Sequence, residues 1–262
     1  MREITSRDNP RFKILKKLLE SSRERRKTGR IFLEGLHLVE SHVRRFDAPI
    51  EIFVCEKALR NPEIAAFLEG SDAGKEAVLL SSALFDSLAM LETPDGIMAI
   101  AARPVPKCEP DKTRDAVLLD GVQDSGNLGS IFRSTAAAGF NQVLLSADCA
   151  RAWSPKTLRA GMGSHFQLDI HEDQCLSGFI EAYRGETILT ALESETDLYL
   201  INLKGPLAWV FGNEGQGIRP ALFKSVRRRV RIPMPGKIES LNVAAAAAIC
   251  LFETLRQRRG NV

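Results

Sequence analysis

The second half of the chain alternates strand signals with helix signals, and this alternation constrains the fold more than any other feature. The run at 116–120 is apolar up to its last residue, as is typical of a strand buried in a parallel sheet. Helical periodicity follows from Leu128 to Ala138. Further strands are expected at 142–146, 166–170, 187–192, 207–212 and 228–233, and further helices from the Ser154-Pro155 pair and over 241–258. Repeated β–α units predict an α/β domain with an open, mostly parallel sheet and helices on both faces.

Residues 1–104 are expected to form a separate, smaller α/β domain. Its strands are expected at 31–35, 51–56, 77–82 and 97–102, and its helices at 11–26, 36–45, 61–69 and 82–90. Asn61, followed by Pro62, and Ser82 are the expected N-caps. The prolines at 104, 106 and 110 stand among charged residues, which predicts a linker over 105–114 and a second domain over 115–262.

Positive charge is concentrated at the N-terminal end. The net charge of the chain is +3, but residues 1–46 contain 13 Lys and Arg against 6 Asp and Glu, so the remainder is slightly acidic. A basic end on a near-neutral body is typical of a phosphate-binding surface. Lys16, Lys17, Arg25 and Arg26 are therefore candidate contacts to nucleic-acid phosphates on the outer face of the first helix. A solvated helix face is the alternative interpretation.

The cysteines indicate neither a disulfide framework nor a metal site. All five are scattered and none forms a C-x-x-C pair, so we expect a reducing compartment and no metal. The N-terminus is charged, without the apolar core of a signal peptide, and the longest apolar run, 243–252, is too short to span a bilayer. We expect a soluble, cytoplasmic protein that does not bind a membrane.

Three segments at the expected carboxyl ends of strands carry unusual residues. Ligands of such sheets bind at these ends, which places the site in the loops 121–127, 146–154, 212–218 and 234–240. The segment 120–140 has no G-x-G-x-x-G, so a dinucleotide site is disfavoured. It contains Asn127, whose amide can orient a polar partner, and Arg133, which is either a salt-bridge partner or a functional group.

The second segment, 209–218, runs from a buried strand into three glycines within six residues, with Asn213 and Glu214 between the first two. Glycines this dense allow the backbone to approach a ligand closely, and a carboxylate at the centre of the turn favours a site over a plain turn. The third segment, 231–253, passes through Pro233 and Pro235 into a helix rich in alanine. By itself it indicates only a buried helix behind a proline-rich turn.

Taken together, the three segments resemble one family. The order N-x-G-x-x-x-R, F-G-N-E-G-x-G and I-P-M-x-G-x-x-x-S-L-N-V-A is similar to the SpoU (TrmH-like) family of RNA 2′-O-ribose methyltransferases, within the SPOUT class. The resemblance covers 115–258. Residues 4–13, 29–40 and 93–101 resemble the N-terminal substrate-binding domain of the same family, a fold related to ribosomal protein L30e. One departure is Ser125, where the family often has proline.

The resemblance implies a deep trefoil knot near the C-terminus, a homodimer, and S-adenosylmethionine (SAM) bound by the second and third segments. The residues that it assigns to the cofactor are Gly212, Asn213, Gly217, Ile232, Met234 and Leu241. Those that it assigns to catalysis are Asn127, Arg133, Glu214, Ser240 and Asn242. Arg133 has been proposed as the base in related enzymes, but a guanidinium with a pKa above ~12 rarely gives up its proton. Arg133 holding a phosphate and the developing oxyanion is physically easier.

Two other functions remain to be weighed. A non-catalytic RNA-binding protein, such as a ribosome-assembly factor on the same fold, would be favoured by loss of Arg133, Asn242 or the Asn213–Glu214 pair, and all of these are present. Within the methyltransferase class, a domain similar to L30e favours ribosomal RNA over transfer RNA as substrate. The sequence does not indicate which nucleotide is modified.

Overall fold

The chain forms two compact units in a computed structural model that describes residues 1–46 and 50–259. The first unit contains residues 1–104 and 153–166, and the second contains 105–152 and 167–262. Segment 153–166, which the sequence analysis assigns to the second domain, thus groups with the first. Its helix α8 (Pro155–Gly161) packs against strand β2, and Ser154 caps it by accepting a hydrogen bond from the Thr157 N–H, as predicted.

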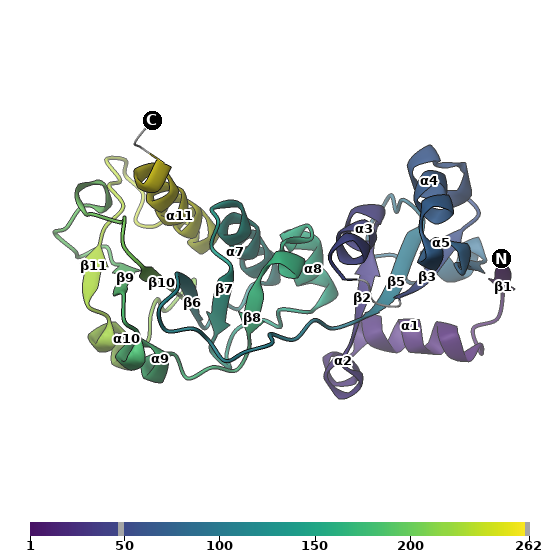
Figure 1. Cartoon of the computed structure of the whole chain (residues 1–262), viewed down its shortest axis with the longest axis horizontal. Coiled ribbons are helices and arrows are strands. Elements are labelled where there is room, and N and C mark those ends of the chain that lie inside the picture. Colours follow the sequence, from purple (N-terminus) through teal and green to yellow (C-terminus); the bar gives the residue numbers. More distant parts are fainter. Residues whose placement is uncertain (47–49, 260–262) are drawn as a thin grey trace. The chain divides into compact units, whose positions relative to one another are not determined.

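The first unit is a mixed sheet between two layers of helices (Figure 1). The strand order is β1-β4-β3-β5-β2, in which β5 runs antiparallel to both of its neighbours. The strands are β1 (Arg2–Ile4), β2 (Arg30–Glu34), β3 (Ile50–Cys55), β4 (Val78–Leu80) and β5 (Ile97–Ala102). The helices are α1 (Pro10–Glu20), α2 (Ser22–Thr28), α3 (Leu36–Arg45), α4 (Pro62–Gly70), α5 (Asp72–Lys75) and α6 (Ser82–Asp86).

Several helix boundaries in this unit differ from prediction, and among them is the end of α6, which lies at Asp86 instead of residue 90. The single helix expected over 11–26 is two helices, because Ser21 ends α1 by donating its N–H to Lys17 and begins α2 by accepting the Glu24 N–H at its hydroxyl. The prediction of Ser82 as an N-cap is wrong, since α6 begins at that residue and Ser81 precedes it. Asn61 is confirmed as the N-cap of α4, where its side chain accepts the Glu63 N–H.

The second unit is built on a sheet in which every pair of neighbouring strands is parallel. Its order is β11-β9-β10-β6-β7-β8. The strands are β6 (Ala116–Asp120), β7 (Gln142–Leu145), β8 (Asp169–His171), β9 (Glu186–Thr190), β10 (Leu207–Gly212) and β11 (Arg228–Val230). The predicted α/β class with a mostly parallel sheet is confirmed, whereas the knot stays a prediction.

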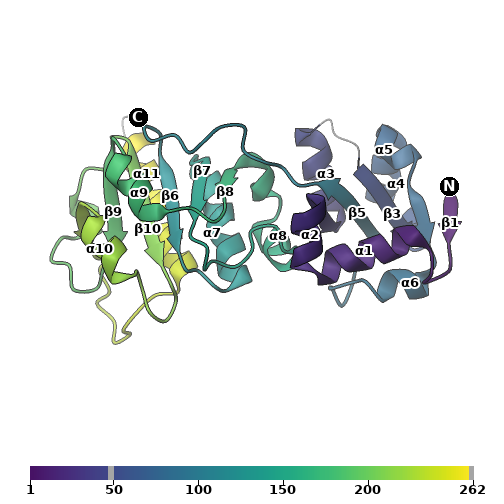
Figure 2. The ribbon, with the colours of Figure 1, turned by 90° about the horizontal axis from the view of Figure 1, so that it is seen from below.

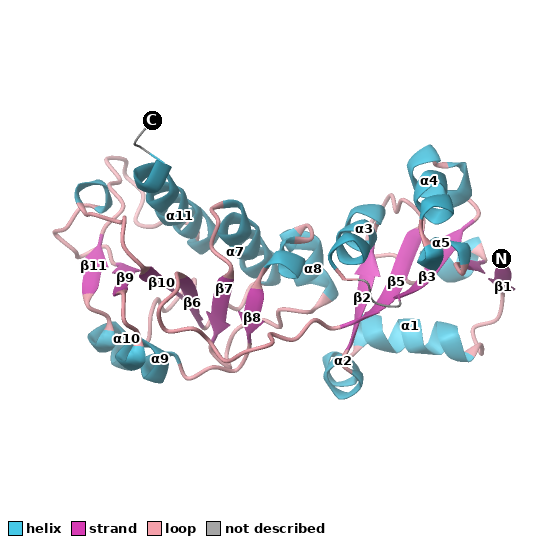
Figure 3. Cartoon of the chain, viewed as in Figure 1, coloured by secondary structure: helices cyan, strands magenta, loops and turns pink. Residues whose placement is uncertain are grey.

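Helices cover both faces of this sheet, as predicted. Helices α7 (Ser125–Ala137) and α11 (Val243–Arg259) pack together on one face, and α9 (Leu176–Ala182) and α10 (Pro220–Ser225) lie on the other (Figures 2 and 3). The core is continuous from the sheet into both layers. On one side Phe179 and Leu222 are buried against the strands, and on the other the Trp209 indole donates to the Thr254 hydroxyl of α11 at 3.1 Å.

Several element boundaries in the second unit depend on local chemistry that the apolar pattern does not reveal. Helix α7 begins at Ser125, three residues before its first apolar position, because the Asp124 carboxylate accepts the Asn127 N–H. The strand expected over 166–170 is a 3₁₀ turn (Ser164–Gln167) followed by β8. Strand β11 ends at Val230, short of Pro233, which has no N–H to donate to a ladder. In the two units together, the sequence analysis missed β1, α5, α9 and α10.

Candidate active site

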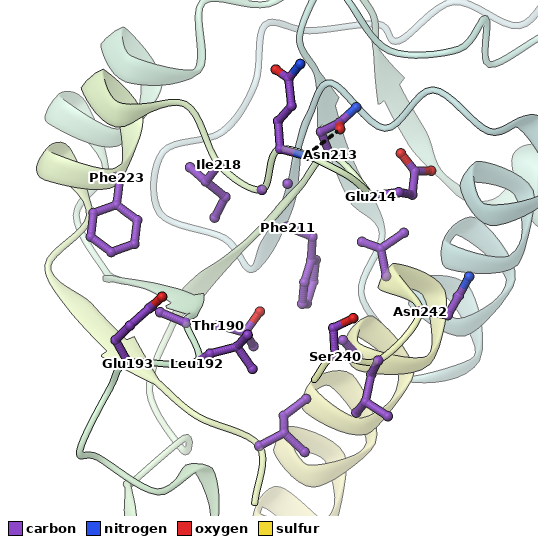
Figure 4. Close-up of a pocket in the computed structure, with 18 of the residues that line it drawn as sticks. Thr190, Leu192, Glu193, Phe211, Asn213, Glu214, Ile218, Phe223, Ser240 and Asn242 are labelled. Atoms are coloured by element: carbon purple, nitrogen blue, oxygen red, sulfur yellow. Dashed lines mark hydrogen bonds between the residues drawn. The ribbon is translucent and has the colours of Figure 1, made fainter. Parts of the chain in front are cut away.

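A cavity of about 500 Å³ opens at the carboxyl ends of strands β9 and β10. Its walls come from the loops after these two strands, from 232–242 and from the first turns of α11 (Figure 4). All six residues predicted to bind the cofactor line it, and so do three of the five predicted catalytic residues. These nine are Gly212, Asn213, Glu214, Gly217, Ile232, Met234, Ser240, Leu241 and Asn242. The third-segment residues thus lie opposite the second segment, as the resemblance implies.

The loop 212–218 is a tight turn closed by its own backbone. Asn213 and Gly217 exchange N–H···O bonds of 2.9 and 3.0 Å, and the Asn213 side-chain oxygen accepts the N–H groups of Gly215 and Gln216. Gly217 has φ +70°, a conformation that favours glycine. A Cβ at Gly212 would lie 2.5 Å from the carbonyl carbon of Gly217. Glycines at these two positions therefore allow the chain to double back on itself.

A chain of three polar side chains joins all three sequence segments. The Asn127 amide nitrogen donates to the Glu214 carboxylate at 3.0 Å, and the Asn242 amide nitrogen donates to the Asn127 oxygen at 2.9 Å. The Asn242 oxygen accepts the N–H groups of Ala244 and Ala245, so Asn242 also caps α11. In both of these side-chain hydrogen bonds the donor lies on the α11 side and the acceptor on the Glu214 side. Asn127 does not itself line the cavity, but it is bonded to two residues that do.

Glu214 is held as an anion. Its carboxylate also accepts the backbone N–H groups of Gln123 and Asp124, each at 3.3 Å. Burial acts to raise the pKa of Glu214, but the hydrogen bonds from the Asn127 side chain and from the backbone outweigh it, so this pKa lies below its usual value. At neutral pH the carboxylate is therefore charged and already engaged by three donors.

Arg133 and Ser240 differ from this network in having no partner within the described chain. Ser240 is exposed at the cavity wall. Arg133 is exposed on α7 and does not line the cavity, so the structure does not bring it together with the other predicted catalytic residues. Six helical residues place it about 9 Å along the axis from Asn127 and about 120° around it.

The loop after β9 supplies part of the cavity that the sequence analysis missed. Thr190, Leu192 and Glu193 line it, together with Phe211 and Phe223. The loop could have been found, because it too follows the carboxyl end of a parallel strand. The Phe223 ring is backed by the Arg229 guanidinium, 4.3 Å from its centroid. A position after the carboxyl end of a parallel strand therefore indicated this cavity-lining loop, which glycine content did not.

The charges and shape of the cavity suit a small cationic molecule with an aromatic part. Glu193 and Glu214 line it, and among the described residues no Lys, Arg or His does. Phe211, Ile218 and Phe223 provide apolar surface on one side (Figure 4). SAM carries a sulfonium and an adenine ring, so the residues present fit it. Within 1–46 and 50–259, no group of three or more His, Cys, Asp and Glu side chains could hold a metal ion, and no helix could cross a membrane.

The expected surface position of one candidate RNA contact is wrong. Arg25 was expected on an outer basic face, but its side chain is buried and donates to the carbonyls of Leu18 and Leu19 at the end of α1. The turn between α1 and α2 folds this residue inward. Lys16, Lys17 and Arg26 are exposed, as expected.

A further ionic cluster, also missed, lies directly beside the cavity loop. The buried Asp120 carboxylate binds Arg219, whose guanidinium also donates to Asp148 at 3.0 Å. The signal for it was a lone carboxylate at the end of an apolar strand, since a buried charge needs a partner.

Known protein families and relatives match the sequence of both units. Residues 115–252 match the model of the SpoU rRNA Methylase family, and residues 9–99 match the MRM3-like substrate binding domain. The chain is 34% identical over 255 residues to the 23S rRNA (guanosine(2553)-2′-O)-methyltransferase RlmP of Bacillus subtilis, covering 96% of this chain and 98% of that protein. It is 28% identical over 239 residues to the 23S rRNA (guanosine-2′-O-)-methyltransferase RlmB of Bordetella pertussis, covering 87% and 98%.

Solved structures agree over nearly the whole length. An RNA 2′-O ribose methyltransferase superposes with a TM-score of 0.84 at 30% identity, covering 98% of this chain and 99% of that one. An rRNA methyltransferase from Sinorhizobium meliloti with bound AdoMet gives 0.82 at 29% identity, with 97% of each chain covered. The protein therefore belongs to the SpoU rRNA methylase family, as its three sequence segments predicted.

Proposed function

We propose that this protein transfers the methyl group of SAM to a ribose 2′-hydroxyl of ribosomal RNA. One observation carries the proposal: a single cavity brings the three family segments together. Its described lining residues include a tight glycine loop and two glutamates but no basic side chain, and Asn127 of the first segment bonds to Glu214 of the second and Asn242 of the third. RlmP and RlmB, named as 23S rRNA 2′-O-methyltransferases, support ribosomal RNA as the substrate. A cytoplasmic location follows as part of the same proposal, because ribosomal RNA is modified where ribosomes assemble.

The cavity residues would hold the cofactor mainly by shape. SAM supplies a methyl group that its sulfonium already activates. Gly212, Asn213 and Gly217 keep the loop backbone close to the cavity, and Ile232, Met234 and Leu241 form the opposite wall. Their task is to orient the methyl group toward the entering ribose and to exclude water.

The remaining work is to align the 2′-hydroxyl and to assist loss of its proton. Glu214 is anionic but already accepts three hydrogen bonds, so its role is to hold Asn127, and through it Asn242, in place; it is not the base. Asn242 positions the start of α11 at the cavity. The free Ser240 hydroxyl is exposed, so it can orient the ribose hydroxyl and relay its proton to solvent water. Arg133, outside the cavity, can hold the neighbouring phosphate and the developing oxyanion.

Loss of one methylated ribose in cells that lack the gene is the direct test. Ribosomal and transfer RNA from cells with and without the gene would be compared by mapping 2′-O-methylated positions, and one position in ribosomal RNA should disappear. Purified enzyme with SAM carrying a tritiated methyl group should then restore it. Loss of a position in transfer RNA would correct the substrate, and loss of none would favour the non-catalytic assembly factor.

RNA binding is expected to depend on the exposed basic face of α1 and α2. Changing Lys16, Lys17 and Arg26 to Ala should weaken RNA affinity and lower its log–log salt slope by up to about one unit for each phosphate that these side chains neutralise. The control changes Lys57 and Arg60, exposed basic residues elsewhere in the same unit, and should leave the slope as it was. If the α1–α2 variant also kept the wild-type slope, the α1–α2 face would not bind RNA.

We further propose that the protein is a homodimer that pairs through α11. Ala245, Ile249 and Phe252 are spaced four and three residues apart and share one face of this helix. Ala245 is exposed and Phe252 is 46% exposed, which is unusual for an apolar helix face without a partner. Phe252→Glu should therefore halve the mass measured by sedimentation equilibrium. The control, Ile14→Glu, places the same charge at an exposed apolar position of α1; a loss of mass there too, or none at Phe252, would contradict pairing through α11.

A further inference from the structure

Both ends of the cavity loop 212–219 are held by one residue, Asp120. At the start of the loop, Gly212 is the register partner of Asp120 where β10 runs beside β6. At the end of the loop, the Arg219 backbone N–H donates to Asp120 Oδ2 at 2.9 Å, and its Nε donates to Oδ1 at 2.8 Å. A second guanidinium nitrogen, Nη2, binds Oδ1 as well. The first residue of the loop thus pairs with the Asp120 backbone, and its last residue binds the Asp120 carboxylate.

The two partners have very different environments. Asp120 is 1% exposed, while the Arg219 side chain is about half exposed. A buried carboxylate is costly without a counter-charge, so Asp120 depends on Arg219 more than the reverse. The hydrogen bond with Asp120 raises the pKa of Arg219, which keeps the guanidinium charged. Asp148, the second acceptor, is 61% exposed and adds only a weak, solvent-screened contact.

The loop needs this closure because of its composition. Three of its first six residues are glycines, which lose the most conformational freedom when they are ordered. Its internal bonds come from Asn213, which pairs with Gly217 and accepts the N–H groups of Gly215 and Gln216. The Asn213 amide also donates to the Gly121 carbonyl, outside the loop, at 2.8 Å. Beyond the loop, Pro220 begins α10, so Arg219 is the last residue that can fasten the loop to β6.

We propose that Asp120 and Arg219 are positioning residues that keep the cofactor loop closed before the cofactor arrives. Neither side chain lines the cavity, so they act only through the loop. The inference rests on the proposed function, in which this loop binds SAM. If the closed loop falls to between about 10% and 1% of the population, apparent affinity weakens by the inverse of that fraction. Loss of the Asp120–Arg219 ion pair should thus weaken SAM binding by about 10- to 100-fold.

The test compares Arg219→Ala and Arg219→Lys with the control Asp148→Asn. SAM affinity would be measured by calorimetry at 20 °C, and hydrogen–deuterium exchange would be followed over 212–219 without SAM. In Arg219→Ala, affinity should fall by about 10- to 100-fold and exchange of the loop should accelerate, with the β6 and β10 amides unchanged. Arg219→Lys keeps the charge without the fork and should lie between this variant and the wild type, and Asp148→Asn should match the wild type.

Steady-state kinetics separates a positioning role from a merely structural one. Arg219→Ala should raise KM for SAM and leave kcat at saturating SAM within about threefold of the wild type. A lower melting temperature with unchanged SAM affinity and loop exchange would overturn the proposal, as would a loss in kcat alone. If Arg219→Ala does not fold, Arg219→Lys decides by the same measurements. Hydrogen–deuterium exchange of the loop needs no ligand. Failure of the wild type to bind SAM would therefore reject the proposed function, while exchange in Arg219→Ala would still test whether the Asp120–Arg219 ion pair holds the loop closed.

Discussion

Gly212→Val should abolish SAM binding while the protein keeps its fold. A Cβ at this position would lie 2.5 Å from the carbonyl carbon of Gly217 and 2.6 Å from its oxygen. These are backbone atoms, so they can give way only if the loop opens. Valine adds two further carbons to the clash. The affinity measured by calorimetry should fall below detection, because the open loop no longer forms a wall of the cavity.

This mechanism differs from the one that the sequence suggests. From the sequence, a branched side chain at Gly212 would be expected to fill the space meant for the cofactor, whereas in the structure it meets the opposite end of its own loop. Gly205→Val is the matched control, since a Cβ there meets nothing within 4 Å. Circular dichroism and melting curves of both variants would establish that they fold. Normal SAM affinity in Gly212→Val would exclude the loop 212–218 from the cofactor site.

Arg133→Lys should lower turnover by roughly 10²–10³, the effect of removing one preorganised oxyanion donor. Lysine keeps the charge of arginine but loses its planar fork, which can hold a phosphate and an oxyanion together. Arg133→Ala should be slower still. Both variants should bind SAM normally, because Arg133 does not line the cavity. Single-turnover rates at saturating SAM and RNA would measure the effect on the chemical step.

The pH dependence of these rates distinguishes a clamp from a base. If Arg133 acts as a clamp, the lysine variant should show little new pH dependence between about pH 6 and 9, because an ammonium with a pKa near ~10.4 stays protonated. If Arg133 is the base, lysine is the better acid–base group, and the rate of this variant should rise steeply with pH. Near-wild-type turnover in Arg133→Ala would contradict both roles and leave Ser240, whose hydroxyl lines the cavity, as the leading candidate for moving the proton.

Local chemistry in the sequence was sufficient for the architecture, and the family resemblance of three segments added most of the cavity residues. Apolar runs and helical periodicity predicted the parallel sheet, because burial on both faces leaves a signal within a few residues of chain. Asn61 and Ser154 marked helix starts, since a cap acts on an N–H group two or three residues away. The resemblance of the three segments to the SpoU family then implied that Gly212, Ile232 and Leu241 share one site, and all three line the cavity.

The tertiary structure alone decided which side chains meet. The hydrogen bond between Asn127 and Asn242 spans 115 residues, and Arg219 reaches Asp120 across 99. Pairs so distant leave no periodic pattern, because strand order and register bring them together only after folding. For the same reason Arg25 looked like a surface charge until the turn at Ser21 buried it against the carbonyls of α1. Spacing along the chain thus determined the elements, while packing between them determined the partners of each charge.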